Sequence, residues 1–257
     1  MTRLDSVPMF DELAEDYDQV LPLCARFGEQ VLELIDDAAG AELLDVGAGR
    51  GAVALAASSR GWHVTAVDAS SQMVDHLRAA DPDMVVRLMD AHALALPDDS
   101  VDVAVAALLL HCVDDPAQVL AEMVRVTRPG GQVVITVPGP VDDGGRWDRF
   151  YEVGAGFRPA PGAVQVARPI DVESLVAVAG LEDAWMGSLE VRLPVSSPRE
   201  LWEWQMSHGF VGFFRSLSPG DQVELERRAL DELWRMHDDG GIELHRGADV
   251  HIARVRR

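Results

Sequence analysis

Short apolar runs alternate along the chain with longer segments in which apolar residues recur every three or four positions. The short runs predict buried strands, and the longer spacing predicts amphipathic helices. Strands alternating with helices are typical of an α/β domain built on a mostly parallel sheet. We therefore expect strands at residues 42–46, 63–67, 85–89, 101–107 and 132–137, and helices at 52–60, 71–80 and 116–127.

The pattern changes after residue 137. A stretch rich in proline and glycine, 138–145, leads into an irregular insertion at 146–167 that carries aromatic residues. A helix is expected at 171–179 and an extended segment at 184–193. A second insertion at 196–239 is helical in pattern and rich in aromatic residues, and a strand is expected at 248–255.

The segment Leu-Leu-Asp-Val-Gly-Ala-Gly-Arg-Gly at residues 43–51 is the most informative motif. An apolar strand carries Asp45 near its end and passes directly into Gly47, Gly49 and Gly51. Glycines allow unusual backbone conformations and let a ligand approach the main chain, and the next helix offers its free N–H groups at the same place. This motif predicts a cradle for a nucleotide-like ligand.

The glycines alone do not distinguish NAD from other adenosine cofactors, because Gly47, Gly49 and Ala52 also satisfy the dinucleotide fingerprint. The charge of Asp45 separates the two. A carboxylate at that position would repel a pyrophosphate and attract an ammonium group. S-adenosylmethionine carries an ammonium and a sulfonium and has no phosphate, so the charge favours it over NAD.

Two more acids follow strand ends. Asp68, after the second strand, could accept hydrogen bonds from both ribose hydroxyls, a feature that NAD enzymes share. Asp90 follows the third strand and could accept the adenine amino group, while the neighbouring Ala91 backbone N–H reaches a ring nitrogen. Asp68 indicates an adenosine-containing ligand in general, and Asp90 makes the pattern more specific.

Together with Arg128-Pro129-Gly130-Gly131, these motifs resemble the class I S-adenosylmethionine-dependent methyltransferases, in particular the methyltransferase type 11 enzymes of ubiquinone and menaquinone biosynthesis. The resemblance covers residues 10–137. It implies a Rossmann-like, doubly wound, seven-stranded α/β sheet, mostly parallel with the last strand antiparallel, plus a helical cap. It also implies S-adenosyl-L-methionine as cofactor and S-adenosyl-L-homocysteine as product.

The pattern along the chain and the resemblance together predict how the chain is organised. N-terminal cofactor-covering helices would occupy residues 1–35, the cofactor-binding core 36–139 and a first cap insertion 140–168. A core helix and strand would follow at 169–195, a second cap insertion at 196–240 and the closing strand at 241–257. Residues 10–18 resemble the covering helix, which would bring Tyr17 near the sulfonium. The implied cofactor-binding residues are Tyr17, Asp45, Gly47, Ala48, Gly49, Asp68, Ala69, Met73, Asp90, Ala91 and Leu108.

Methyl transfer needs little covalent machinery beyond alignment of the acceptor and, where required, its deprotonation. His111, just after the fourth strand, is a candidate base or substrate-orienting group, or else part of the cofactor pocket lining. His208 is a second catalytic candidate, or else a surface or satisfied polar residue. The chain has no His-Glu-x-x-His motif, so the sequence predicts no metal.

The methyl acceptor is expected to bind where the insertions and the N-terminal helix meet. Its pocket would be formed by Tyr17 and residues 108–112, 147–157 and 202–214. The aromatic residues of these segments either line an apolar or aromatic substrate pocket or form the core of the cap itself.

Composition narrows the possible functions. The formal net charge is -21 and all 22 basic residues are arginine, which disfavours nucleic acid partners and excludes lysine-dependent chemistry. Two cysteines fit a reducing cytoplasm. The longest apolar run, 103–110, is much shorter than the roughly 20 residues of a membrane span, and the N-terminus lacks the apolar core of a signal peptide.

The sequence thus predicts a cytoplasmic methyltransferase acting on a small, apolar or aromatic metabolite through an oxygen, nitrogen or carbon acceptor. Secondary metabolism and quinone-like substrates are both compatible with the resemblance. Two alternatives are an NAD-type oxidoreductase and a non-catalytic S-adenosylmethionine-binding protein, since a fold does not fix a function. The sequence makes no prediction about the oligomeric state.

Overall fold

The computed structural model describes residues 7–36, 40–158 and 168–256. Parts of the predicted N-terminal segment and first cap insertion, at 1–6 and 159–167, and residue 257 of the closing segment lie outside the described residues. The described chain forms one seven-stranded sheet in the order β3-β2-β1-β4-β5-β7-β6. The strands are β1 (Glu42–Val46), β2 (His63–Asp68), β3 (Val85–Leu88), β4 (Val101–Ala107), β5 (Thr127–Gly139), β6 (Glu182–Val195) and β7 (Ile242–Arg254).

The sheet is parallel except for its last strand in the chain. β1 lies between β2 and β4 and pairs with both in parallel, whereas β7 is antiparallel to β5 and β6. Neighbouring residues of β1 point to opposite faces of the sheet. Leu43 packs in a hydrophobic cluster on one face, and Leu44 packs in another cluster on the other face. The predicted Rossmann-like fold with an antiparallel closing strand is therefore confirmed.

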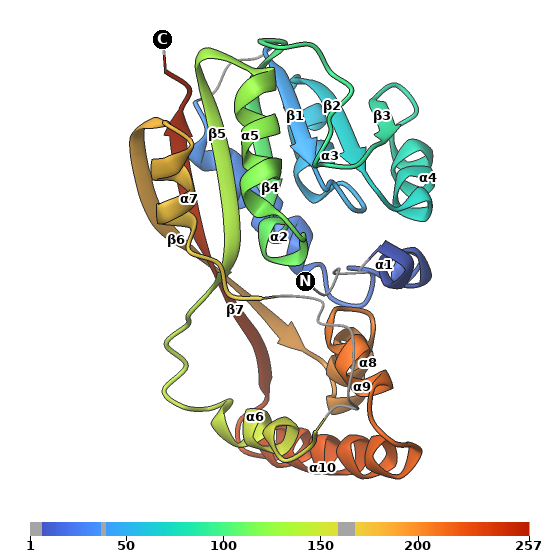
Figure 1. Ribbon diagram of the computed structural model, residues 1–257. Helices are drawn as coiled ribbons and strands as arrows, with labels where there is room; N and C mark the ends of the chain where they lie inside the picture. The colour runs from blue at the N-terminus through green and yellow to red at the C-terminus, as the bar shows by residue number, and fades with distance from the viewer. Residues whose placement is uncertain (1–6, 37–39, 159–167, 257) are drawn as a thin grey trace.

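Helices cover both faces of this sheet (Figure 1). On one face, α2 (Leu23–Leu34), α3 (Ala52–Ser59) and α4 (Ser71–Ala80) pack against the side chain of Leu43 and its neighbours. On the other face, α5 (Pro116–Val126) and α7 (Val172–Val178) pack against Leu44 and its neighbours. This arrangement leaves the carboxyl ends of β1, β2 and β4 available to form a site.

Local sequence explains where several helices begin. The Ser70 hydroxyl accepts a hydrogen bond from the Met73 N–H at 3.1 Å, and the Asp115 carboxylate accepts one from the Gln118 N–H at 3.0 Å. Each side chain satisfies a donor that a helix N-terminus leaves free. Residues 71–80 and 116–126 are helical, as the sequence predicts to within one residue.

Strand β5 starts earlier than expected. The sequence places it at 132–137, because Pro129 and Gly130 interrupt the preceding helix, but the strand begins at Thr127. The main chain passes so close to β4 that a Cβ on Gly131 would lie 2.6 Å from the Asp102 carbonyl oxygen. Gly131 thus lets the chain run beside β4 where a side chain would not fit.

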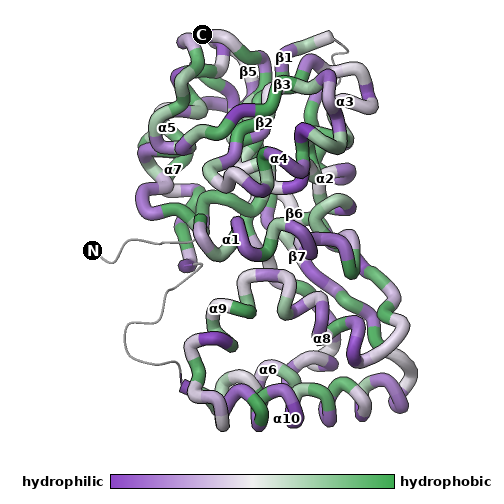
Figure 2. The backbone as a smooth tube through the Cα atoms, turned by 90° about the vertical axis from the view of Figure 1, so that its right-hand side faces the viewer, coloured by the Kyte–Doolittle hydropathy of each residue, from purple (hydrophilic) through white to green (hydrophobic). Residues whose placement is uncertain are grey.

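The cap is carried by two unusually long strands. β6 and β7 extend past the other strands, and α6 (Asp148–Ala155), α8 (Pro198–Met206), α9 (Phe210–Arg215) and α10 (Pro219–Asp238) gather at their far ends (Figure 1). Apolar and polar residues alternate along α10, the pattern of a helix with one buried face (Figure 2). The two strands were expected at 184–193 and 248–255, so the prediction from the sequence underestimates the length of both strands.

The aromatic residues of the insertions form the core of the cap. Trp147 is 1% exposed, and Trp202 and Trp204 are almost as fully buried. The Trp202 ring lies edge-on against the rings of Phe210 and Phe214, with centroids 6.0 and 5.7 Å apart. Their packing matches the interpretation that these aromatic residues form the core of the cap rather than line a substrate pocket.

Candidate functional site

The glycine loop, residues 47–51, makes a tight turn between β1 and α3. Gly47, Gly49 and Gly51 have φ values of +71°, +54° and +89°, which other residues adopt only with strain. The Gly47 and Ala48 N–H groups both donate to the Val67 carbonyl, at 2.8 and 3.0 Å. A Cβ on Gly49 would meet nothing within 4 Å, so the main chain there faces open space.

That open space belongs to a cavity of about 950 Å³, here called the central cavity. Ligand pockets in proteins commonly occupy about 300–1,000 Å³. All eleven residues that the resemblance implies for the cofactor line this cavity, although their individual roles stay predictions. They are Tyr17, Asp45, Gly47, Ala48, Gly49, Asp68, Ala69, Met73, Asp90, Ala91 and Leu108.

Asp68 fixes the loop from the end of β2. One carboxylate oxygen accepts the Gly49 N–H at 2.8 Å, and the other accepts the Ser70 N–H at 2.8 Å. Burial raises the pKa of this carboxyl, and these backbone hydrogen bonds partly offset the effect. Each oxygen has a further lone pair, so the carboxylate retains acceptor capacity for a ligand.

Asp45 is more deeply buried, at 2% exposed. Its carboxylate accepts the Ala54 N–H of α3 at 3.0 Å. Burial raises the pKa of Asp45 to about 7, and the nearby Asp68 adds to this rise. The free protein therefore holds an acid whose charge is poorly compensated, and a cation in the central cavity would stabilise its ionised form.

Asp90 also lines the central cavity and is paired with His92. Its Oδ1 is 2.7 Å from the His92 ring Nδ1 and also accepts the His92 N–H at 2.9 Å. The other ring nitrogen accepts the Asp115 N–H at 3.3 Å, so the proton of a neutral ring belongs on Nδ1. His92 therefore orients Asp90, a role that the sequence does not reveal.

The N-terminal segment covers the central cavity through contacts that cross the sequence. Helix α1 (Val7–Leu13) is tied to α4 because the Ser70 hydroxyl donates to Asp11 at 2.6 Å. Arg50, inside the glycine loop, donates to the carbonyls of Ala14 and Glu15 at 2.5 and 2.9 Å. Sequence reasoning missed Asp11 and Arg50, because only the folded chain brings their partners to them.

After β4 the chain turns sharply at Leu108, which has a positive φ of +53° without being glycine. The Leu108 N–H donates to the carbonyl and the hydroxyl of Thr136, both at 3.0 Å, and so holds the strained backbone. Left-handed backbone at such a residue costs on the order of 1 kcal/mol and is often found at functional sites. The turn brings Leu108 and Leu109 to the wall of the central cavity.

Neither catalytic candidate, His111 nor His208, is among the described residues that line the central cavity. His111 lies in the short helix η1 (Leu110–Cys112), and its Nδ1 is buried without a hydrogen-bond partner. Burial lowers the pKa of both imidazoles to about 4, so each is neutral at pH 7. The His208 ring packs on the Tyr17 ring with centroids 4.6 Å apart.

The expected acceptor pocket is only partly formed by the predicted segments. Tyr17, Leu108 and Cys112 line the central cavity, but none of the described residues of segments 147–157 and 202–214 does. The prediction is corrected on this point, because the aromatic side chains of those segments are used to fill the cap. The part of the first insertion at 159–167 is outside the described residues.

Comparisons with known proteins find similarity to methyltransferases. Residues 44–135 match the family model described as a methyltransferase domain. An uncharacterized methyltransferase of Mycobacterium tuberculosis is 40% identical over 132 residues, which are 51% of this chain and 53% of the relative. The chain thus spans about half the length of this relative.

Two more similarities cover most of the chain. The nocamycin O-methyltransferase of Saccharothrix syringae is 28% identical over 91% of this chain and 92% of its own length. The structure of Haemonchus contortus phosphoethanolamine N-methyltransferase 2 in complex with S-adenosyl-L-methionine has a TM-score of 0.55 at 18% identity, over 90% of this chain and 53% of that one. The predicted resemblance to methyltransferases is confirmed, and these similarities give no support to an NAD-type oxidoreductase.

The sequence also predicts the absence of a membrane span. Among residues 7–36, 40–158 and 168–256, no helix combines the length and the apolar character that a membrane crossing requires.

Proposed function

Because residues 44–135 match the methyltransferase domain, we propose that this chain transfers the methyl group of S-adenosyl-L-methionine to a small acceptor molecule. The observation that carries the proposal is one cavity lined by the glycine loop together with Asp45, Asp68 and Asp90. S-adenosyl-L-homocysteine would be the product. The acceptor would be a small metabolite with an apolar or aromatic body and an oxygen, nitrogen or carbon nucleophile.

Electrostatics support this cofactor over a dinucleotide. Asp45 is buried and Asp68 is half-buried, and desolvation raises the pKa values of both, so further negative charge in their surroundings is unfavourable. A pyrophosphate bound at the glycine loop would add negative charge beside them. A ligand with an ammonium and a sulfonium would instead compensate both carboxylates.

The proposed roles follow the ends of the strands. The glycine loop and Asp45 would hold the amino acid part of the cofactor, with its ammonium near the Asp45 carboxylate. Asp68 would accept the ribose hydroxyls with the lone pairs that Gly49 and Ser70 leave available. Asp90, held by His92, would accept the adenine amino group, and Met73 and Leu108 would pack against the ligand's apolar surface.

The proposed mechanism needs alignment more than covalent chemistry. When bound, the cofactor would supply a methyl group on a positively charged sulfur for in-line transfer to the acceptor's nucleophile. The protein would hold both reactants and exclude water. The N-terminal segment covers the cavity for this purpose, held by the hydrogen bonds of Arg50 to Ala14 and Glu15. The hydrogen bond between Asp11 and Ser70 holds the same segment. His111 and His208 do not line the central cavity, and burial lowers the pKa of each to about 4, so we assign neither as the base of the reaction.

Transfer of a labelled methyl group tests the proposed activity. The purified chain is incubated with S-adenosyl-L-methionine carrying a labelled methyl group and with small-molecule fractions of a cell extract. The proposal expects label in a small organic product and one S-adenosyl-L-homocysteine formed per methyl transferred. Binding of the cofactor with no transfer to any fraction would favour the non-catalytic alternative.

A further inference from the structure

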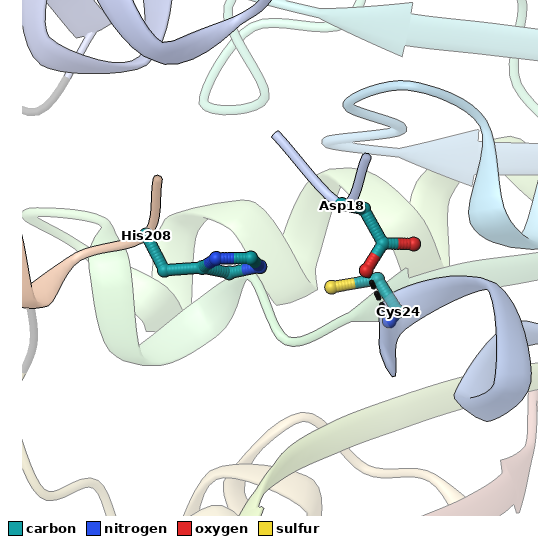
Figure 3. A group of neighbouring side chains, drawn as sticks. All are labelled: Asp18, Cys24 and His208. Atoms are coloured by element: carbon teal, nitrogen blue, oxygen red, sulfur yellow. Dashed lines mark hydrogen bonds between the residues drawn. The ribbon is translucent and has the colours of Figure 1, made fainter. Parts of the chain in front are cut away.

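Three side chains that can bind metals meet beside the central cavity: Asp18, Cys24 and His208 (Figure 3). One carboxylate oxygen, the thiol sulfur and one ring nitrogen lie within 4.8 Å of one another. Asp18 and Cys24 belong to the N-terminal segment, whereas His208 follows α8 in the cap. The cluster therefore joins two parts of the chain that are far apart in sequence, which is why no local motif announces it.

His208 is already oriented as a ligand. Its Nδ1 is 2.9 Å from the Trp204 carbonyl oxygen, and because a carbonyl only accepts hydrogen bonds, the ring proton belongs on Nδ1. The other nitrogen, Nε2, then carries a lone pair, and it is buried without a hydrogen-bond partner. Histidines that bind metals commonly donate their second N–H to a carbonyl in this way.

Asp18 is held in place by the start of α2. One of its carboxylate oxygens accepts the Cys24 N–H at 2.8 Å, and the other accepts the Ala25 N–H at 2.9 Å. These bonds explain the position of Asp18 as a helix cap, and they leave lone pairs on both oxygens. The capping bonds of Asp18 involve only the start of α2 and leave the buried Nε2 of His208 without a partner. A buried nitrogen of this kind is normally satisfied by a ligand or a hydrogen bond.

We propose that Asp18, Cys24 and His208 form a zinc site with one carboxylate, one thiolate and one imidazole ligand. This mixed donor set suits Zn²⁺, which binds sulfur at about 2.3 Å and nitrogen or oxygen at about 2.0–2.2 Å. The three donor atoms already lie within 4.8 Å of one another, so one ion can be shared by all three. On binding, the Cys24 sulfur gives its proton to solvent and forms the bond to the metal.

Three protein ligands leave a fourth position open, which is typical of catalytic rather than structural zinc sites. Asp18 and Cys24 both line the central cavity, so this position is adjacent to it. A consequence that rests on the proposed function is that a hydroxyl group of the acceptor would bind there and lose its proton more easily. The zinc site itself does not depend on that function.

Zinc binding by the full chain tests the proposal. Protein stripped with a chelator is loaded with Zn²⁺, passed through a desalting column and analysed for metal. We expect one retained zinc per chain in the wild type, and at least a hundredfold weaker binding in Cys24→Ser and His208→Gln. Cys112→Ser is the matched control, because it removes the chain's other thiol, which also lines the cavity but lies outside the cluster, and it should retain zinc.

Cobalt gives a second, spectroscopic readout. Co²⁺ in the proposed site should produce a thiolate-to-metal absorption band in the wild type and Cys112→Ser but not in Cys24→Ser. No retained zinc and no such band in the wild type, or zinc retention by Cys24→Ser and His208→Gln equal to that of the wild type, would overturn the site. Zinc retained by a protein that binds no S-adenosyl-L-methionine would leave the site standing and reject the proposed function.

Discussion

At the scale of single residues, the acids at the strand ends carry the proposed cofactor chemistry. Asp68 is the clearest case, because its two oxygens already order the Gly49 and Ser70 N–H groups around the central cavity. Its removal would lose both the expected ribose contacts and part of the loop's support. Asp45 differs, because it is buried with a single backbone partner, Ala54, and a raised pKa.

We expect Asp68→Ala to weaken binding of S-adenosyl-L-methionine by about 1.5–3 kcal/mol, the range of hydrogen bonds to charged groups. Calorimetric titration measures the change. Asp83→Ala is the control, because Asp83 is an exposed acid outside the central cavity and should leave the affinity unchanged. Equal affinity of Asp68→Ala and wild type would remove Asp68 from the site, provided that thermal unfolding shows both variants folded.

The raised pKa of Asp45 predicts a pH dependence of binding. The ammonium group of the ligand favours ionised Asp45, whose pKa is about 7 in the free protein. At pH 6 about a tenth of the molecules carry the charge and at pH 8 about nine tenths, so affinity should be about tenfold higher at pH 8. Titration in buffers at the two pH values measures this ratio.

Asp45→Asn should bind more weakly and with little change between pH 6 and pH 8. Ionisation of Asp45 has the opposite effect on folding stability. Because the pKa of Asp45 is higher in the folded protein than in the unfolded chain, protonated Asp45 favours the folded state, and this stabilisation is lost as the pH rises from about 4 through 7. Affinity that falls between pH 6 and pH 8 in the wild type would contradict the assignment of Asp45.

The sequence is sufficient to find those acids because each lies at or just after the end of a strand in a repeating strand–helix pattern. It could not find Arg50, Asp11 or the cluster of Asp18, Cys24 and His208. Their partners come from other parts of the chain, so the interactions exist only after folding. It also could not decide the role of His111, whose position after β4 was predictable but whose buried, unpartnered Nδ1 was not.

At the scale of elements, the approach of α2 to α3 determines how the N-terminal part of the chain packs beside the glycine loop. A Cβ on Gly28 in α2 would lie 2.2 Å from the Ala52 carbonyl oxygen at the start of α3. Gly28 is therefore required by the distance between the two helices, although its own backbone is helical.

We expect Gly28→Ala to destabilise the protein by about 1–3 kcal/mol, the usual cost of overpacking, because α2 must move away from α3. Gly154→Ala is the matched control. Gly154 is also helical, in α6, but a Cβ there meets nothing within 4 Å, so its substitution should stabilise by up to about 1 kcal/mol. Urea unfolding measures both, and equal effects of the two variants would disprove the close contact.

Element positions were largely predictable from the sequence, because helix caps and β-rich runs are local signals. The lengths of β5, β6 and β7 were not. Residues 127–131 contain Pro129 and two glycines, yet the fold uses them as strand. The extensions of β6 and β7 pair with each other away from the core, with Val195 opposite Ile242, and such pairing has no local signature.

At the scale of the whole molecule, a methyltransferase-like core is joined to a cap by the long paired strands β6 and β7. The core supplies the central cavity, and the cap supplies His208 and its contact with Tyr17. The sequence separated core from cap at a shift in composition after residue 137. It could not establish that the aromatic residues of the cap pack with one another, since a substrate pocket and a core have the same composition.

The account depends most on the identity of the cofactor. Calorimetric titration of the wild-type chain with S-adenosyl-L-methionine, S-adenosyl-L-homocysteine and NAD measures it directly. We expect each of the first two to bind at one site per chain with micromolar affinity, and NAD to bind at least a hundredfold more weakly. Micromolar binding of NAD with no binding of the two sulfur compounds would contradict the account.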